Sequence, residues 1–138
     1  MRVAAKPGLY RAETDPPILN GTRCTACATV FFPPLGIGCE VCGAPADNLT
    51  EAGIEATGVL DSVATVHVYA GDDMQVPFTV GEIRLADGPL IRGLFDSEID
   101  LQEIGASVHA RWKIVGVDEN GNELVEPRFK LAADGGVK

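Results

Sequence analysis

The stretch Cys24-Thr25-Ala26-Cys27, followed after eleven intervening residues by Cys39-Glu40-Val41-Cys42, decides the fold of this chain. It contains all four cysteines of the 138-residue sequence, arranged as two C-x-x-C pairs. Two residues between thiols is the spacing of a tight turn that points both sulfur atoms at one centre. Two such turns supply the four thiolates of a tetrahedral zinc site. We therefore predict a zinc ribbon whose ligands are Cys24, Cys27, Cys39 and Cys42.

Other cysteine chemistries fit the pattern less well. Iron in a rubredoxin-like site uses the same paired turns and is the main alternative metal. A redox-active dithiol needs only one C-x-x-C pair, at the start of a helix that follows a strand. Disulfides are disfavoured because nothing in the sequence suggests secretion. Four thiolates leave zinc no open position for water or substrate, so the predicted site is structural rather than catalytic.

Composition and charge limit the partners that this chain can have. Hydrophobic residues make up 46% of the sequence, which is enough to build a core. The chain has 11 Lys and Arg against 20 Asp and Glu, for a formal charge of −9. That balance repels phosphate backbones and disfavours nucleic acid as a partner. Residues 1–7 lack the apolar run of a signal peptide, and no stretch is long enough to span a bilayer, so a cytoplasmic location away from membranes is predicted.

The pattern of the chain changes after the cysteines and divides it into four parts. Residues 1–20 form an N-terminal arm in which Pro7, Pro16 and Pro17 prevent a long helix. Such an arm lies either along its own domain or along a partner, and the sequence leaves both open. Residues 21–50 form the zinc ribbon, residues 51–133 an all-β domain, and residues 134–138 a tail.

The all-β domain shows the period-two alternation of strands separated by turn residues. In the clearest case Val108, Ala110, Trp112 and Ile114 share the inward face. Pro127 cannot donate to a ladder and marks an edge strand or a bulge. Five strands with one longer connection between the third and fourth fit a small Greek-key barrel of the OB-fold type. The predicted strands span residues 58–69, 78–85, 90–95, 107–115 and 124–131.

Alternation also predicts a cationic stripe on the outward face of the last two strands. In this acidic chain it is the only local group of basic residues, consisting of Arg111, Lys113, Arg128 and Lys130. An anionic ligand is one interpretation of the stripe. A solvated face paired with Glu126 and its neighbours is the other.

The order of these motifs resembles a known family, the zinc-ribbon/OB-fold proteins catalogued as domain-of-unknown-function family 35. The resemblance covers residues 21 to about 131. The matching residues are the two cysteine pairs, Phe32-Pro33-Pro34 between them, Gly43, Gly58-Val59-Leu60 at a strand start, and Ile104-Gly105 before Val108-x-Ala110-x-Trp112. Members of this family often begin with a helix before the ribbon, and the proline-rich arm departs from that pattern.

The resemblance implies a role beside acyl-CoA enzymes. Members of the family bind thiolase-fold proteins, such as thiolases and steroid side-chain aldolases, and the thiolase-like subunit carries the catalytic residues. This chain would then be an accessory subunit of a hetero-oligomer, with structural zinc and a CoA thioester bound near the interface. The cationic stripe supplies candidate contacts to CoA. Exposed apolar groups supply the candidate interface, namely Phe31, Phe32, Met74 and Phe78.

The residues themselves indicate no catalytic set in this chain. Its two histidines, His67 and His109, fall on separate predicted strands, and no nucleophile or phosphate-binding motif is present. The alternative function is a nucleic-acid-binding module, because ribbons and OB barrels both occur in that role. Single-strand sites need stacking aromatics in a positive groove, whereas aromatics make up only 6% of this acidic chain.

Overall fold

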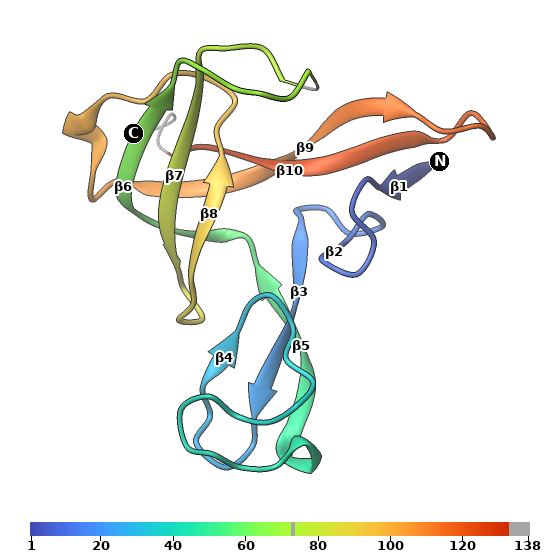
Figure 1. The fold of residues 1–138 in the computed structure, drawn as a ribbon, viewed down its shortest axis with the longest axis vertical. Helices are drawn as coiled ribbons and strands as arrows, with labels where there is room; N and C mark the ends of the chain where they lie inside the picture. Colours follow the sequence, from blue (N-terminus) through green and yellow to red (C-terminus); the bar gives the residue numbers. More distant parts are fainter. Residues whose placement is uncertain (73, 133–138) are drawn as a thin grey trace.

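A computed structural model describes residues 1–72 and 74–132 of the chain. It is mainly β, as predicted from the sequence. Figure 1 shows a small sheet at the bottom, a curled larger sheet above it, and a long hairpin that projects to the right. The described residues contain no α-helix and two short 3-10 helices, Ala46–Asn48 and Leu101–Glu103.

The small sheet carries the cysteines and is built around one central strand, β3. This strand pairs antiparallel with each of the other three strands of the sheet, and its last residue is Cys24. The longest pairing, with β5, holds the two ends of the cysteine segment together. The strands are β2 (Tyr10–Arg11), β3 (Ile18–Cys24), β4 (Val30–Phe31) and β5 (Leu49–Glu55).

The larger sheet has the strand order β1-β10-β9-β6-β7-β8. All its pairs are antiparallel except β1 with β10. Phe95, just after β8, forms a parallel bridge with Phe129 of β10. This bridge closes β6 to β10 into a five-stranded ring, the arrangement of a partly open Greek-key barrel. The strands are β1 (Arg2–Ala4), β6 (Thr57–Val66), β7 (Phe78–Leu85), β8 (Leu90–Leu94), β9 (Ser107–Val117) and β10 (Glu123–Leu131).

The predicted strands are present, but the predicted burial of β9 is wrong at one end. Val108 and Ala110 are buried, whereas Ile114 is 54% exposed. The reason is that β9 pairs with β6 only over its first three residues. Beyond that point β9 and β10 leave the barrel as the projecting hairpin of Figure 1.

The N-terminal arm lies along its own chain. Its first strand, β1, pairs in parallel with β10, and β2 pairs with β3. The side chain of Trp112 donates a hydrogen bond from Nε1 to the carbonyl oxygen of Thr14. The sequence left open whether the arm lies along its own domain or along a partner, and in the structure it lies along its own domain. The predicted tail, residues 134–138, lies outside the described residues.

One hydrophobic core runs through the arm, the small sheet and the barrel. Tyr10 of the arm and Ile54 of β5 belong to the same buried cluster as Leu60 and Val108 of the barrel. Only Ala56 separates β5 from β6, so the chain passes directly from one sheet to the other. The cluster comprises Tyr10, Leu19, Ile54, Ala56, Leu60, Ile83, Leu85, Ile91, Phe95, Ile99, Val108, Ala110 and Phe129.

Among the described residues no helix has the length and apolarity needed to cross a bilayer.

Candidate metal centre and barrel cavities

Two similar turns present the four cysteines. In the first, the N–H of Ala28 donates to the carbonyl oxygen of Cys24 at 2.8 Å. In the second, the N–H of Gly43 donates to the carbonyl oxygen of Cys39 at 3.1 Å. Both donor residues have positive φ, 67° for Ala28 and 79° for Gly43. The left-handed conformation costs glycine little and alanine more, so the first turn is the strained one of the pair.

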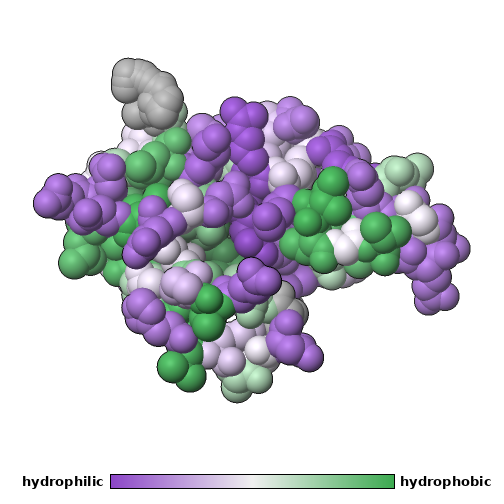
Figure 2. Space-filling view, turned by 90° about the horizontal axis from the view of Figure 1, so that it is seen from above, coloured by the Kyte–Doolittle hydropathy of each residue, from purple (hydrophilic) through white to green (hydrophobic). Residues whose placement is uncertain are grey.

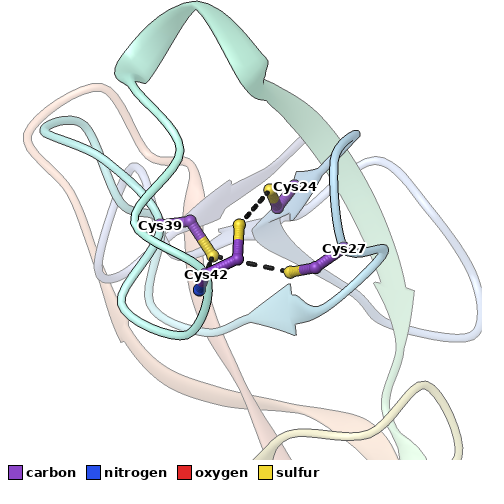
Figure 3. Close-up of side chains that lie close together, drawn as sticks. All are labelled: Cys24, Cys27, Cys39 and Cys42. Carbon is purple, nitrogen blue, oxygen red and sulfur yellow. Dashed lines mark hydrogen bonds between the residues drawn. The ribbon is translucent and has the colours of Figure 1, made fainter.

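The sulfur atoms converge on one point between these turns (Figure 3). All four Sγ atoms lie within 4.8 Å of one another. The Sγ atoms of Cys24 and Cys42 are 3.7 Å apart, and those of Cys27 and Cys39 are 3.6 Å apart. Tetrahedral zinc with Zn–S bonds of about 2.3 Å requires sulfur–sulfur separations of about 3.8 Å. The cluster therefore already has the size of a zinc tetrathiolate.

Hydrogen bonds prepare two of the sulfur atoms to be thiolates. The Thr29 side chain, 3.2 Å from Cys27 Sγ, is the main cause that lowers the pKa of Cys27 to about 6. The N–H groups of Cys42 and Val41 each lie 3.4 Å from Cys39 Sγ and lower the pKa of that thiol. Donors aimed at sulfur favour the charged form, which is the form that binds metal.

Crowding has the opposite effect on Cys42. A backbone hydrogen bond with Ala44 lowers its pKa, but burial and the three neighbouring sulfur atoms outweigh it and raise the pKa to about 12. Four thiolates this close together need a cation between them. All four ligands are sulfur atoms, as is common for structural zinc, and together they complete its tetrahedral coordination. The residues thus fit structural zinc, which when bound would hold the two turns together.

Comparison with known proteins agrees with this geometry. Residues 11–48 match the family model described as the ChsH2 rubredoxin-like zinc ribbon domain. The ribbon is similar to the ChsH2 type. The resemblance to domain-of-unknown-function family 35 is therefore confirmed. A solved structure described as "Ltp2-ChsH2(DUF35) aldolase" is similar over 84% of this chain and 86% of that chain, with 25% identity and a TM-score of 0.64. A search of curated proteins finds no match.

The structure divides the predicted cationic stripe. Arg111, Lys113 and Lys130 are exposed on the hairpin strands, as predicted. Arg128 is instead 9% exposed, and its Nη2 lies 2.6 Å from the Glu126 carboxylate. Arg128 lies on the predicted outward face of its strand, but the prediction that it is solvated is wrong, because the chain between β6 and β7 closes over this part of β10: Met74 lines two cavities together with Arg128.

A cavity of about 450 Å³ lies between the chain that connects β6 to β7 and the strands β9 and β10. Lys113 and Arg128 contribute basic groups to its wall, and Met74 and Phe78 contribute apolar ones. The remaining residues of the stripe are elsewhere. Arg111 lines a separate cavity of about 390 Å³ with His109, and Lys130 lines neither. His67 is exposed just after β6, so the structure does not bring the two histidines into one cavity.

The four predicted interface residues fall at two ends of the molecule. Phe31 lies on β4 in the small sheet at the bottom of Figure 1, whereas Met74 and Phe78 lie at the chain between β6 and β7, at the top. Phe32 packs against the core cluster, so part of its surface is used within the chain. Phe78 also meets Tyr69 edge to face, with ring centroids 5.4 Å apart. Sequence reasoning missed Tyr69, because the predicted strand 58–69 ended on it, whereas β6 ends at Val66.

Proposed function

We propose that this chain is a non-catalytic accessory subunit that binds a thiolase-fold enzyme of acyl-CoA metabolism. The observation that carries the proposal is the match to the Ltp2-ChsH2(DUF35) aldolase over most of both chains, together with the ChsH2-type ribbon. The partner would carry the nucleophile and the acid–base groups for thiolytic or aldol cleavage or formation of a carbon–carbon bond. This chain would support that subunit.

The chemistry of the described residues is consistent with such a division of labour. The tetrathiolate cluster offers zinc no open position, so the metal would hold the fold rather than polarise a substrate. The rubredoxin-like zinc ribbon model matches residues 11–48, which include the same four cysteines. Catalysis would therefore come from the partner.

The cavity between the β6–β7 connection and the hairpin strands is our candidate for contact with CoA. Lys113 is its exposed basic group, whereas Arg128 is buried and paired with Glu126, which also lies opposite Lys113 in the strand register. Asp96 and Glu98 line the same cavity and disfavour a second phosphate group nearby. Met74 and Phe78 offer an apolar surface to the rest of the ligand. We therefore assign the CoA contact to Lys113 first and to Arg128 second, since Arg111 and Lys130, the other two residues of the stripe, lie outside this cavity.

The interface with the partner is proposed to use the apolar groups at the same end of the barrel, Met74 and Phe78, which are half-buried rather than exposed as the sequence predicted. Met74 and Phe78 border the CoA cavity, so a partner docked there would cover both the apolar groups and the ligand. Phe31 on β4 and the neighbouring Phe32, which lines a cavity with Ile91 and Pro127, would serve a second contact. Fully buried apolar anchors commonly dominate the binding free energy of such interfaces.

Affinity capture with the zinc-loaded full chain tests the proposal. We expect a thiolase-fold protein to be retained from a native extract and identified by mass spectrometry, and Phe78→Glu to reduce its recovery at least tenfold. The matched control is Val68→Glu, an exposed apolar residue that lines none of these cavities. Turnover of a CoA thioester by the isolated chain would overturn the proposal. Tight, steeply salt-dependent binding of single-stranded DNA would favour the alternative, a nucleic-acid-binding module.

The CoA contact has its own test. The captured complex should bind CoA, and Lys113→Glu should weaken that binding at least tenfold while leaving the complex assembled. Lys130→Glu makes the same charge change outside the cavity and is the control. Equal loss of CoA binding in both variants would contradict the assignment to the cavity.

A further inference from the structure

Two cavities meet at the buried ion pair of β10. The cavity of about 450 Å³ beside Lys113 and a second cavity of about 430 Å³ share three lining residues, Met74, Phe78 and Arg128. Glu126, the partner of Arg128, lines the second cavity, which we call the ion-pair cavity. Because they share a wall, the two cavities form one continuous groove that passes over the Arg128–Glu126 pair.

Both hydrogen bonds within the pair end on the same carboxylate oxygen. Nε and Nη2 of Arg128 lie 2.9 Å and 2.6 Å from Oε1 of Glu126. Nη1 of Arg128 and Oε2 of Glu126 bond to none of the described residues, and both atoms keep accessible surface. The two side chains are otherwise covered, and both line the ion-pair cavity. This cavity is therefore offered one charged donor and one charged acceptor.

The chemistry of the pair selects neutral amides rather than phosphate. The charges of Arg128 and Glu126 offset each other, and a phosphate beside the pair would meet the Glu126 carboxylate. A chain with secondary amides presents C=O acceptors to the guanidinium and N–H donors to the carboxylate. Hydrogen bonds to charged groups are stronger than those between neutral groups, so an amide gains from both partners.

The remaining walls of the ion-pair cavity are mostly apolar. Leu94 and Val115 line it together with Met74 and Phe78, and Lys6 of the arm adds one cation. Figure 2 looks down on the end of the molecule that carries the β6–β7 connection, where polar groups run across the middle and apolar patches lie on both sides. Apolar walls with a few polar groups are typical of small-molecule sites. They suit a chain in which methylene groups alternate with amides.

We propose that the ion-pair cavity binds the pantetheine arm of CoA, with Arg128 and Glu126 as the residues that bind its amides. This inference rests on the proposed CoA contact and gives the ligand a direction. The phosphate groups lie at Lys113, and the arm crosses Met74 and Phe78 to reach the ion pair. Pantetheine carries two amides in series, so one accepts from Nη1 of Arg128 while the other donates to Oε2 of Glu126. A peptide also carries amides but brings no phosphate to Lys113, so the continuity of the groove favours CoA.

Titration of the zinc-loaded full chain with pantetheine, which has the amides but no phosphate, tests the proposal. We expect saturable binding in the millimolar range by NMR, and the double variant Glu126→Leu/Arg128→Met should weaken it at least tenfold. Replacing both partners of a buried pair by apolar groups commonly preserves stability, which urea unfolding checks. Glu82→Leu/Arg92→Met makes the same exchange at an exposed pair outside both cavities and is the control. Absence of saturable binding, or equal binding by the two double variants, would overturn the proposal.

An ester analogue tests the amides on the unmodified chain. Replacing the amide N–H groups of pantetheine by oxygen keeps the carbonyl acceptors but removes the donors to Glu126. The analogue should bind about tenfold more weakly, because a hydrogen bond to a charged group is lost. An unchanged affinity would contradict the amide contact.

Two further ligands test the direction and the source of the amides. CoA should bind more tightly than pantetheine, and Lys113→Glu should remove this gain while leaving the affinity for pantetheine unchanged. Tighter binding of N-acetylalanine methylamide than of pantetheine would identify a peptide site and overturn the assignment to CoA. Because no partner protein takes part, failure of these titrations contradicts this inference alone, whereas failure to capture a thiolase-fold protein contradicts the proposed function alone.

Discussion

Trp112 and Thr14 lie 98 positions apart in the sequence, and the indole Nε1–H of Trp112 donates a hydrogen bond to the Thr14 carbonyl oxygen at 2.7 Å. The same indole ring lies 5.7 Å from the ring of Tyr10 and 5.7 Å from the guanidinium carbon of Arg2. One side chain of β9 thereby holds three parts of the N-terminal arm. The arm is thus fixed by contacts of high sequence separation rather than by a pattern of its own.

Replacing Trp112 by Phe should loosen the arm. The substitution keeps an aromatic ring but removes the hydrogen bond, at a cost of about 1 kcal/mol in the free energy of unfolding. Hydrogen exchange at residues 2–4 should increase, because β1 depends on the anchored arm. The measurements are urea unfolding and amide exchange. Thr14→Ala keeps the carbonyl acceptor and is the control; equal destabilisation by both variants would refute the role of this bond.

Removing Glu126 should be costly, because Arg128 would remain buried without its carboxylate. The Arg128 and Glu126 side chains are only 11% and 14% exposed. Loss of one partner of a buried ion pair costs about 3–5 kcal/mol, so Glu126→Gln should lower the urea midpoint clearly. Glu82→Gln breaks the pair with Arg92, whose side chain is 81% exposed, and should cost less than about 1 kcal/mol. Equal effects would show that Arg128 is solvated.

Gly58 should not tolerate a side chain. It pairs with Leu85 at the start of the barrel, and a Cβ there would overlap the carbonyl oxygen of Arg84. Because the obstacle is backbone, we expect Gly58→Ala to cost about 1–3 kcal/mol or more in thermal or urea unfolding. In the control, Gly116→Ala, the nearest atom to the new Cβ is a Leu124 carbon at 3.6 Å, an ordinary contact. A neutral Gly58→Ala would mean that β6 and β7 separate readily.

Zinc should be lost as the pH falls. Zinc binds thiolates and displaces their protons, so acid favours the free ribbon. In the metal-free cluster Cys42 has a pKa of about 12 and still carries its proton at neutral pH. At least one proton is therefore released on binding, and affinity should fall at least about tenfold per pH unit below pH 7. Competition with a chromogenic chelator measures this; a pH-independent affinity would contradict a thiolate site.

Two substitutions separate the effect of losing a zinc ligand from the effect of losing a hydrogen bond to a ligand. Cys42→Ser removes a ligand and should reduce the zinc content from one per chain to near zero in elemental analysis. Thr29→Val leaves all four ligands but removes the hydrogen bond that lowers the pKa of Cys27 to about 6. That pKa should rise toward its ordinary value of about 9, so zinc should be released at a higher pH than from the unmodified chain.

The metal centre was predictable because it is local. Two C-x-x-C turns fix the ligands by their spacing alone, and the structure brings all four sulfur atoms together. The strands of the barrel were predictable for a similar reason, since alternation marks them wherever one face is buried. Phe78–Leu85 matches its predicted range without change.

Long-range contacts were not predictable in the same way. Alternation placed Ile114 on the inward face, and only the departure of the hairpin from the barrel exposes it. Alternation also placed Arg128 outward, correctly for the face of the strand. Nothing in the local sequence indicates that the chain between β6 and β7 covers that face or that Glu126 pairs with the guanidinium there.

The continuous core has a practical consequence for dissecting this protein. A fragment starting near residue 51 would retain all barrel strands but lose Tyr10 and Leu19, which belong to the same buried cluster as Leu60 and Val108. Its newly bared apolar surface should make it aggregate, however well the remaining strands pair. Shortened versions should therefore not be made by cutting between the ribbon and the barrel.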